Sequence, residues 1–325
     1  MGGVILCGLM PPVGAMVPLP AELLLFTQQE LYAATPELET QSVSIVISRA
    51  IAPYVASAQG TQQALKDAGI RTVQVQNMAG DLNEAGRIAA ELRAHPPDVI
   101  VTVGTEATRA MRREFDDIPI ISSMVVHPET LLEKDQSVYG ASLEVPAGTQ
   151  LSSLKELLPS AQRVGILYNP TLHGETAMDR RREAARENHV ELVLQPVSAA
   201  ADIPKGLQAL LVKQADALWL IPDETVLAPE TVQNLLLETL RSRLPVVAPA
   251  LLFVQRGALL GVGGDYREVG RQAGEMAVSL LSGKRLAAPM TEARKAVLYL
   301  NLRSAQALGI DVPKALIDRA EQVIR

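Results

Sequence analysis

The stretch DVIVTVGTEAT, residues 98–108, decides the predicted fold. Residues 99–103 are all β-branched and apolar at four of five positions, which predicts a buried strand of a parallel sheet. Gly104 and Thr105 then turn the chain into a polar, amphipathic stretch, residues 106–115, which predicts a helix capped by Thr105. Backbone N–H groups and the positive end of the helix dipole would lie just beyond the strand, so we expect a carboxylate to bind there.

The same pattern returns in DALWLIPDET, residues 216–225, where Asp223 stands near the place of Thr105. The neighbouring predicted strands repeat in the same order, with offsets of 118 to 126 residues between equivalent positions. We therefore predict an α/β protein that contains two copies of one βαβαβαβ unit. The copies form two Rossmann-like lobes with parallel sheets.

Composition and charge exclude several classes of protein. The chain has 325 residues, 48% hydrophobic and 20% charged, which suits an ordered protein with two lobes. A net charge of -6 without a run of lysine or arginine argues against nucleic acid as a partner. Cys7 is the single cysteine and the four histidines are far apart, so we expect no disulfide, no metal and no cofactor.

Residues 1–41 are predicted to form a leader or a disordered extension. Val4 to Met10 is apolar, but the prolines that follow leave no stretch near the roughly 20 residues of a membrane helix. Small residues after this stretch fit a secretory leader, whereas the positively charged start of such a leader is missing. An export leader is favoured over a cytosolic extension, and a bulky residue before Cys7 argues against its lipidation.

The chain is predicted to cross between the lobes at residues 144–149, near Gly264 and before Ala296. The predicted boundaries are 42–143 with about 265–290 for the first lobe, and 144–264 with about 291–325 for the second. Three local expectations are an exit loop at 49–58 that carries Tyr54, a fourth strand at 118–122, and a terminal helix at 314–324.

Ligands bind outside the carboxyl ends of such parallel strands, and two facing sheets enclose a cleft. The candidate residues at these ends are Ser48, Tyr54, Thr105, Ser122, Ser123, Tyr168, Asn169, Asp223, Asp265 and Tyr266. Simpler roles stay open for several of them. Thr105, Asp223 and Asp265 each suit the cap of a following helix, Tyr168 and Asn169 suit a turn, and the two serines suit a loop.

No arrangement of residues typical of an enzyme is present. The chain lacks a G-x-S-x-G motif, a second cysteine and a phosphate-binding loop. The cluster GVGG, residues 261–264, lacks the spacing of a dinucleotide site. A second alternative is the ligand-sensing module of a regulatory system with the same fold, although no DNA-binding segment precedes Val43.

Five segments, taken in order, resemble one known family. The segments are VTVGTEA (101–107), LKELLPSAQRVGILYNP (154–170), DALWLIPDE (216–224), GALLGVGGDYREVGRQAG (257–274) and NLRSAQALGIDVPKALIDRAEQVI (301–324). They resemble the ABC-transporter substrate-binding proteins whose characterised members bind aromatic or other amino acids. The resemblance covers about Val43 to the C-terminus, and one difference is His127-Pro128 where family members usually have Asp-Pro.

The resemblance implies a type I periplasmic binding fold with a hinge of crossover strands and no enzymatic activity. It also implies a periplasmic or extracytoplasmic monomer that delivers a small ligand to an ABC permease. For this chain we expect an amino acid, including aromatic or branched ones. Thr105, Ser48 and a serine after the fourth strand would hold its carboxylate. Asp223 would hold its ammonium with Asp265 nearby, and tyrosines would flank its side chain.

Overall fold

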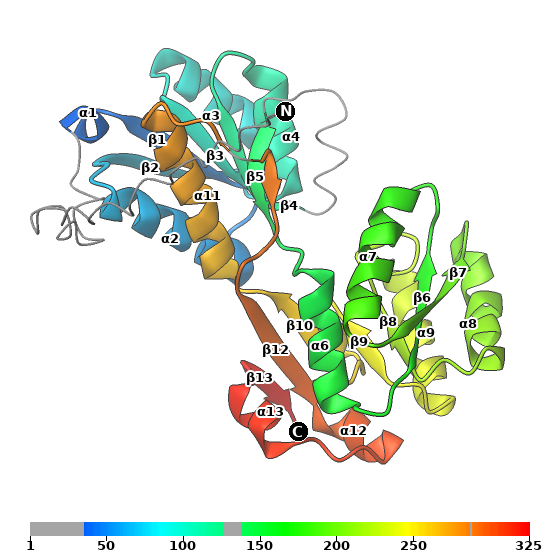
Figure 1. Ribbon diagram of the computed structural model, residues 1–325. Helices are drawn as coiled ribbons and strands as arrows, with labels where there is room; N and C mark the ends of the chain where they lie inside the picture. Colours follow the sequence, from blue (N-terminus) through cyan, green and yellow to red (C-terminus); the bar gives the residue numbers. More distant parts are fainter. Residues whose placement is uncertain (1–35, 126–137, 287) are drawn as a thin grey trace, which may run out of the picture.

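The computed structural model describes residues 36–125, 138–286 and 288–325. These residues form two sheets, and the helices packed on each sheet complete two lobes (Figure 1). The first sheet has the order β11-β5-β4-β3-β1-β2, and all its neighbouring strands are parallel. Its strands are β1 (Ser42–Ile47), β2 (Thr72–Asn77), β3 (Val99–Val103), β4 (Ile120–Val125), β5 (Val138–Ser142) and β11 (Met290–Thr291).

The second sheet has the order β13-β12-β10-β9-β8-β6-β7. Only the pair of β10 and β12 is antiparallel among its described neighbours. Its strands are β6 (Arg163–Tyr168), β7 (Glu191–Pro196), β8 (Ala217–Trp219), β9 (Val246–Ala248), β10 (Leu260–Gly264), β12 (Ala296–Asn301) and β13 (Gln322–Ile324).

The two sheets repeat one strand order. The run β2-β1-β3-β4-β5 in the first sheet matches β7-β6-β8-β9-β10 in the second. In both sheets the first strand of the unit therefore has the second strand on one side. The third, fourth and fifth strands follow in order on its other side. This confirms the predicted α/β fold with two lobes built on parallel sheets.

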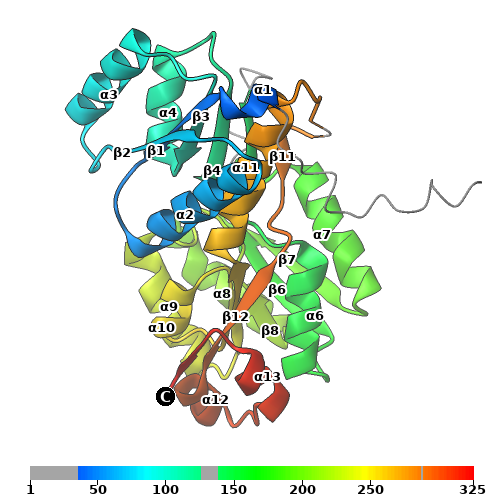
Figure 2. The same cartoon turned by 90° about the vertical axis from the view of Figure 1, so that its left-hand side faces the viewer.

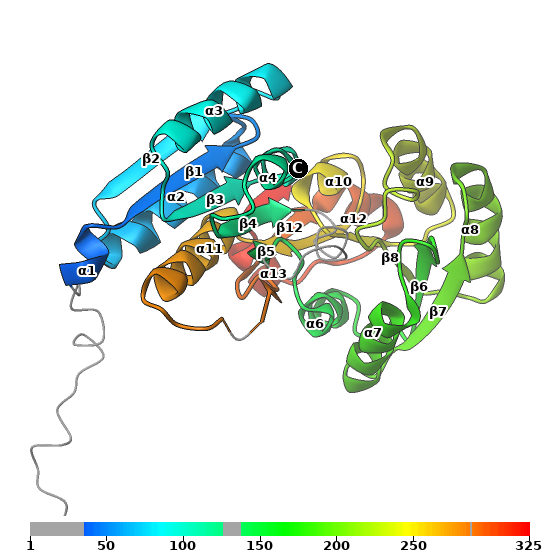
Figure 3. The same cartoon turned by 90° about the horizontal axis from the view of Figure 1, so that it is seen from above.

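Helices cover both faces of the first sheet. On one face lie α2 (Ala52–Asp67) and α11 (Tyr266–Leu281), and on the other α3 (Leu82–Ala94) and α4 (Thr105–Glu114) (Figure 3). Alternate strand residues supply the two cores: Ile45 and Val101 face α2 and α11, whereas Val46 and Ile100 face α3 and α4. Burial on both faces explains why these strands are continuously apolar.

The second lobe is layered in the same way. Its helices are α6 (Ala147–Leu157), α7 (Glu175–Glu187), α8 (Ile203–Val212) and α9 (Pro229–Arg241), with a 3-10 turn at Ala200–Asp202. Val164 and Ile166 of β6 pack with α6 and α7, whereas Leu167 and Leu218 pack with α8 and α9. The shorter helices α10 (Leu251–Gln255), α12 (Leu302–Leu308) and α13 (Lys314–Arg319) complete this lobe.

The chain passes between the two sheets three times. It leaves β5 for α6, returns from β10 into α11, and leaves β11 for β12. Figure 2 shows the first lobe above the second, with β11 leading down into β12. As a result, α11 packs in the first lobe although strands β6 to β10 of the second lobe precede it in sequence.

The contact between α2 and α11 joins backbone to backbone. A Cβ atom at Gly270 would lie 1.9 Å from the carbonyl oxygen of Ser57, and one at Gly60 would lie 1.9 Å from that of Arg267. The Thr61 hydroxyl donates a hydrogen bond of 2.9 Å to the carbonyl oxygen of Gly270. Only glycine allows this separation, which places α11 against the same face of the sheet as α2.

Three local predictions were wrong. Tyr54 lies in α2 rather than in a loop, because the helix begins at Ala52 and Pro53 suits a first helical turn. The predicted terminal helix ends at Arg319, since the chain then pairs with β12 as β13. The fourth strand extends to Val125, with a shift in pairing after Ser123.

Some predictions fall outside the described residues. Residues 1–35, with Cys7, and the His127-Pro128 pair are among these. Within the predicted extension, Pro36–Glu39 form the short helix α1, and Leu38 is buried against the main core. Residues 36–39 are therefore part of the folded protein. The numerical boundaries of the lobes stay a prediction.

We predict that Gly270→Ala lowers the free energy of unfolding by about 3 kcal/mol, because the new methyl group forces α11 away from α2. The matched control is Gly86→Ala in α3, where a Cβ atom meets nothing within 4 Å. That substitution is expected to stabilise by up to about 1 kcal/mol through helix propensity. Urea denaturation of both variants measures the difference, and equal effects would contradict the close contact.

Candidate ligand-binding site

A cavity of about 420 Å³ lies where strand ends of the second lobe meet the crossings. Val125 reaches it from β4 of the first lobe, and Leu143 from the segment after β5. Most of its wall is apolar. The lining residues are Val125, Leu143, Glu144, Val145, Gln150, Pro222, Asp223, Glu224, Leu227, Ala228, Pro229, Pro249, Ala250, Phe253 and Val262. Such a wall suits the hydrocarbon part of a small ligand.

Asp223 lines this cavity, but its carboxylate is bonded to the protein itself. Oδ2 accepts from the backbone N–H of Asn169 at 2.7 Å and lies 3.3 Å from Nε2 of His173. Oδ1 accepts from the backbone N–H groups of Thr225 and Val226 at 2.9 and 3.1 Å. These bonds join the loop after β6 to the turn after β8. The residue is 1% exposed, so the connection is buried inside the lobe.

The pKa of Asp223 reflects these contacts. Burial acts to raise the pKa, but the nearby His173 and the hydrogen bonds from the backbone of Asn169 and Val226 outweigh it and lower the pKa. The carboxylate is therefore charged in the folded protein at neutral pH. His173 is itself 6% exposed, so the pair is a buried one.

In the first lobe, Ser48 completes the start of α4. Its hydroxyl donates to the carbonyl oxygen of Val103 at 3.0 Å and accepts from the backbone N–H of Ala107 at 2.9 Å. Gly104 occupies the N-cap position with a φ of 92°, and Thr105 is the first helical residue. The prediction that Thr105 caps the helix was therefore wrong. Ser48 does so from the neighbouring strand.

Tyr54 lies beside this helix start. A Cβ atom at Gly104 would come within 2.9 Å of the tyrosine ring, so only glycine lets the ring approach. Burial, with a smaller contribution from Glu106, raises the pKa of Tyr54, while Arg49 acts to lower it. The phenol stays neutral and lies at the carboxyl edge of the first sheet.

Ser122 and Ser123 lie inside β4, not after it, and both are fully buried. The Ser122 hydroxyl donates to the carbonyl oxygen of Tyr139, and the Ser123 hydroxyl lies 2.7 Å from that of Ser57. Their predicted place beyond the strand end was therefore wrong. Met124, with a φ of 60°, turns the backbone directly after them and is the strained point of this strand end.

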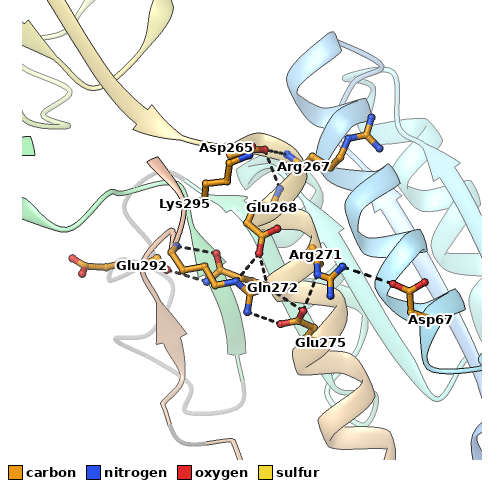
Figure 4. Close-up of polar contacts among 10 residues, drawn as sticks. Asp67, Asp265, Arg267, Glu268, Arg271, Gln272, Glu275, Glu292 and Lys295 are labelled. Atoms are coloured by element: carbon orange, nitrogen blue, oxygen red, sulfur yellow. Dashed lines mark hydrogen bonds and ion pairs between the residues drawn. The ribbon is translucent and has the colours of Figure 1, made fainter. Parts of the chain in front are cut away.

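Asp265 and Tyr266 begin α11 at the second crossing. The Asp265 carboxylate accepts from the backbone N–H groups of Arg267 and Glu268, and it pairs with Nζ of Lys295 at 2.6 Å (Figure 4). Burial raises the pKa of the Tyr266 phenol, and the neighbouring Tyr299 acts to lower it. Asp265 thus has the capping role that the sequence left open.

The third crossing is fixed to α11 by side chains. Gln272 donates to the carbonyl oxygen of Glu292 at 3.0 Å and accepts from the N–H of Arg294 at 3.1 Å. Its side-chain amide thus makes the two hydrogen bonds that the backbone of a neighbouring strand would make. The Arg294 guanidinium pairs with Glu268 at 2.5 Å and with Glu275 at 2.8 Å. This crossing therefore stays with the first lobe up to Lys295.

Tyr168 and Asn169 follow β6 in the second lobe. The Asn169 side chain accepts from the N–H of Thr171 and donates to the Thr225 hydroxyl, both at 2.9 Å, so it forms the predicted turn. Tyr168 is half-buried against the core. Of the ten candidate residues only Asp223 lines the cavity, and the ligand-binding role of all ten stays a prediction.

The sequence did not point to the apolar wall. Phe253, Leu227 and Val262 line the cavity, yet each fits the periodicity of an ordinary core position. Glu224 also lines it and follows the predicted Asp223 directly. Only its position at a strand end could have indicated it. Within the described residues no group of acidic, histidine or cysteine side chains could hold a metal ion, and no helix is long and apolar enough to cross a membrane.

Comparison with known proteins identifies the family of this chain. Residues 43–324 match the family of ABC transporter substrate binding proteins, and the chain belongs to this family of binding proteins rather than enzymes. A tyrosine-binding protein of Clostridioides difficile is 25% identical over 278 residues, 82% of this chain and 79% of that protein. The predicted family resemblance is confirmed.

Two solved structures share the fold. A ligand-free, open substrate-binding protein with adhesive properties from Clostridium difficile has a TM-score of 0.68 at 24% identity, covering 87% of this chain and 99% of that one. A domain from Streptococcus pneumonia in complex with L-Trp has a TM-score of 0.57 at 23% identity, covering 87% and 100%. Both support the two-lobed type I architecture.

We predict that Asp223→Ala lowers the free energy of unfolding by about 3 kcal/mol, because three backbone N–H groups and His173 lose their acceptor. Asp311→Ala is the control, since Asp311 is exposed and lies in the same lobe. Its effect is expected to stay within about 0.5 kcal/mol. A small effect at Asp223 in chemical denaturation would contradict its structural role.

Stability should also depend on Asp223 in acid. Its pKa in the folded protein lies below the usual value of 3.8, so its contribution is complete above that pH and is lost as the pH falls through the lowered pKa. Urea midpoints measured from pH 6 to pH 2 should therefore fall more steeply for the unmodified protein than for Asp223→Ala. Parallel curves would show that the carboxylate gains nothing from folding.

Proposed function

We propose that this protein is the extracytoplasmic solute-binding component of an ABC importer and that it binds an amino acid between its lobes. The observation that carries the proposal is the cavity of about 420 Å³ that residues of both lobes line. A volume of this size suits one small metabolite and excludes a polymer.

The first lobe supplies a place for the ligand carboxylate. Helix α4 begins at the carboxyl edge of the first sheet, with Ser48 and Thr105 at its N-terminal end. The positive end of the helix dipole favours an anion at this edge. We propose that closure brings this helix start toward a ligand that already lies on the second lobe.

The apolar wall supports an aromatic or branched side chain in the ligand. Leu143, Leu227, Phe253 and Val262 are the hydrophobic residues that a ring or a branched chain would contact. The similar proteins named above as a tyrosine-binding protein and as a complex with L-Trp support the aromatic alternative. In this proposal the wall takes the place of the tyrosines expected to flank the side chain.

Closure would bend the three crossings and leave the lobes intact. Gln272 and Arg294 fix the third crossing to the first lobe, so bending falls beyond Lys295. A ligand that contacts both lobes only in the closed form shifts the population toward that form. A membrane permease that receives the closed monomer is the partner we propose.

A thermal-shift screen of the common amino acids tests the proposal. A ligand at a hundredfold excess over its dissociation constant should stabilise the fold by about 2.7 kcal/mol. Ala250→Trp places a ring in the cavity and should abolish the shift, whereas Ala94→Trp, on the exposed end of α3, should leave it unchanged. If no amino acid shifts the midpoint, the proposed ligand class is wrong.

A further inference from the structure

We infer that Glu224, not Asp223, binds the ammonium group of the ligand; this inference rests on the proposed function. The site would thereby select organic amines with an apolar body, held between one carboxylate and the hydrophobic wall. Glu224 would determine specificity, while Asp223 would only position it.

Asp223 has no acceptor site left for a ligand. A carboxylate offers about four lone-pair positions; three backbone N–H groups occupy three of those of Asp223, and Nε2 of the buried His173 lies 3.3 Å from Oδ2 beside the fourth. An ammonium group would have to displace a backbone N–H or His173 inside a lobe where Asp223 is 1% exposed. The buried donor would then lose its partner, which costs more than the new contact returns.

Glu224 is arranged in the opposite way. Its side chain lines the cavity and is exposed, and within the described part of the chain it makes no hydrogen bond or ion pair. The turn that Asp223 bonds at Thr225 and Val226 fixes the backbone on its C-terminal side. The backbone thus holds the Glu224 carboxylate at the cavity, while the carboxylate itself makes no contact that stabilises the described part of the chain.

The surroundings of Glu224 favour an organic cation. Leu227 and Phe253 share the cavity with it, so a ligand can bury hydrocarbon beside the charge. A charge-assisted hydrogen bond next to an apolar wall is stronger than one in open water. A simple metal ion would gain nothing from that wall.

Glu144 is the other acidic residue of the cavity. It lies on the first crossing, where its carbonyl oxygen accepts from the N–H of Ala293 at 2.8 Å. It lies near Glu292 on the adjacent crossing, and burial together with the Glu144 charge raises the pKa of Glu292. Glu144 also lines an adjoining pocket with Arg180 and Arg181, whose positive charges disfavour a second cation there, so we assign the ammonium to Glu224.

The test compares L-tyrosine with 3-(4-hydroxyphenyl)propanoate, which lacks the amine, by titration calorimetry on the full chain. The unmodified protein should bind L-tyrosine about ten- to hundredfold more tightly than the analogue. Glu224→Gln should lose that preference and leave the affinity for the analogue nearly unchanged. The thermal midpoint without ligand should not move, because the side chain has no partner to lose.

Two further variants keep the assignment falsifiable. Glu191→Gln, an exposed residue at the start of β7, is the matched control and should retain the full preference. Glu144→Gln should change it less than Glu224→Gln. If the unmodified protein binds L-tyrosine and Glu224→Gln keeps the preference, the assignment is wrong while the proposed function stands. If the unmodified protein binds neither L-tyrosine nor L-tryptophan, the aromatic ligand class and the assignment fail together.

Discussion

The backbone contact between α2 and α11 is the constraint on which the rest of the structure depends. It joins a helix from the beginning of the chain to one that follows the five parallel strands β6 to β10 of the second sheet, and glycines at both sides make it close. Since α11 also carries Gln272, Glu268 and Glu275, its position sets where the third crossing is held. The packing of α11 on α2 in the first lobe thus determines where the third crossing is anchored, and in the proposed closure the second lobe would move relative to that anchor.

The fold was predictable because it depends on patterns that are local in sequence. The run Val99–Val103 was located to the residue, since burial on both sides demands an unbroken β-branched segment. The repeat of that pattern at Asp216 implied the second lobe. The errors fell where tertiary pairing decides: the sequence 322–324 suits a helix by itself, but beside the edge of β12 it forms β13.

The sequence predicted Asp223 among the residues that line the cavity, but none of the other lining residues. The cavity lies beside the carboxyl ends of β8 and β9, and a parallel sheet points all such ends to one edge. Which polar group stays available there depends on long-range bonds, such as that of Ser48 to Ala107, 59 residues away. A list of polar residues cannot tell which side chains are hydrogen-bonded within the protein and which stay available to a ligand. It also omits the apolar wall, whose residues resemble ordinary core positions.

The threefold passage of the chain between the sheets has a consequence for the order of assembly. During synthesis, β1 to β5 emerge before the second lobe, yet the face of α2 that contacts α11 stays uncovered until residues 266–281 have followed. The second lobe's five parallel strands are complete by residue 264. The first sheet is complete only at Thr291 and the second only at Ile324, so each lobe waits for a late part of the chain, and a chain interrupted before residue 266 would expose the bare face of α2 to other molecules.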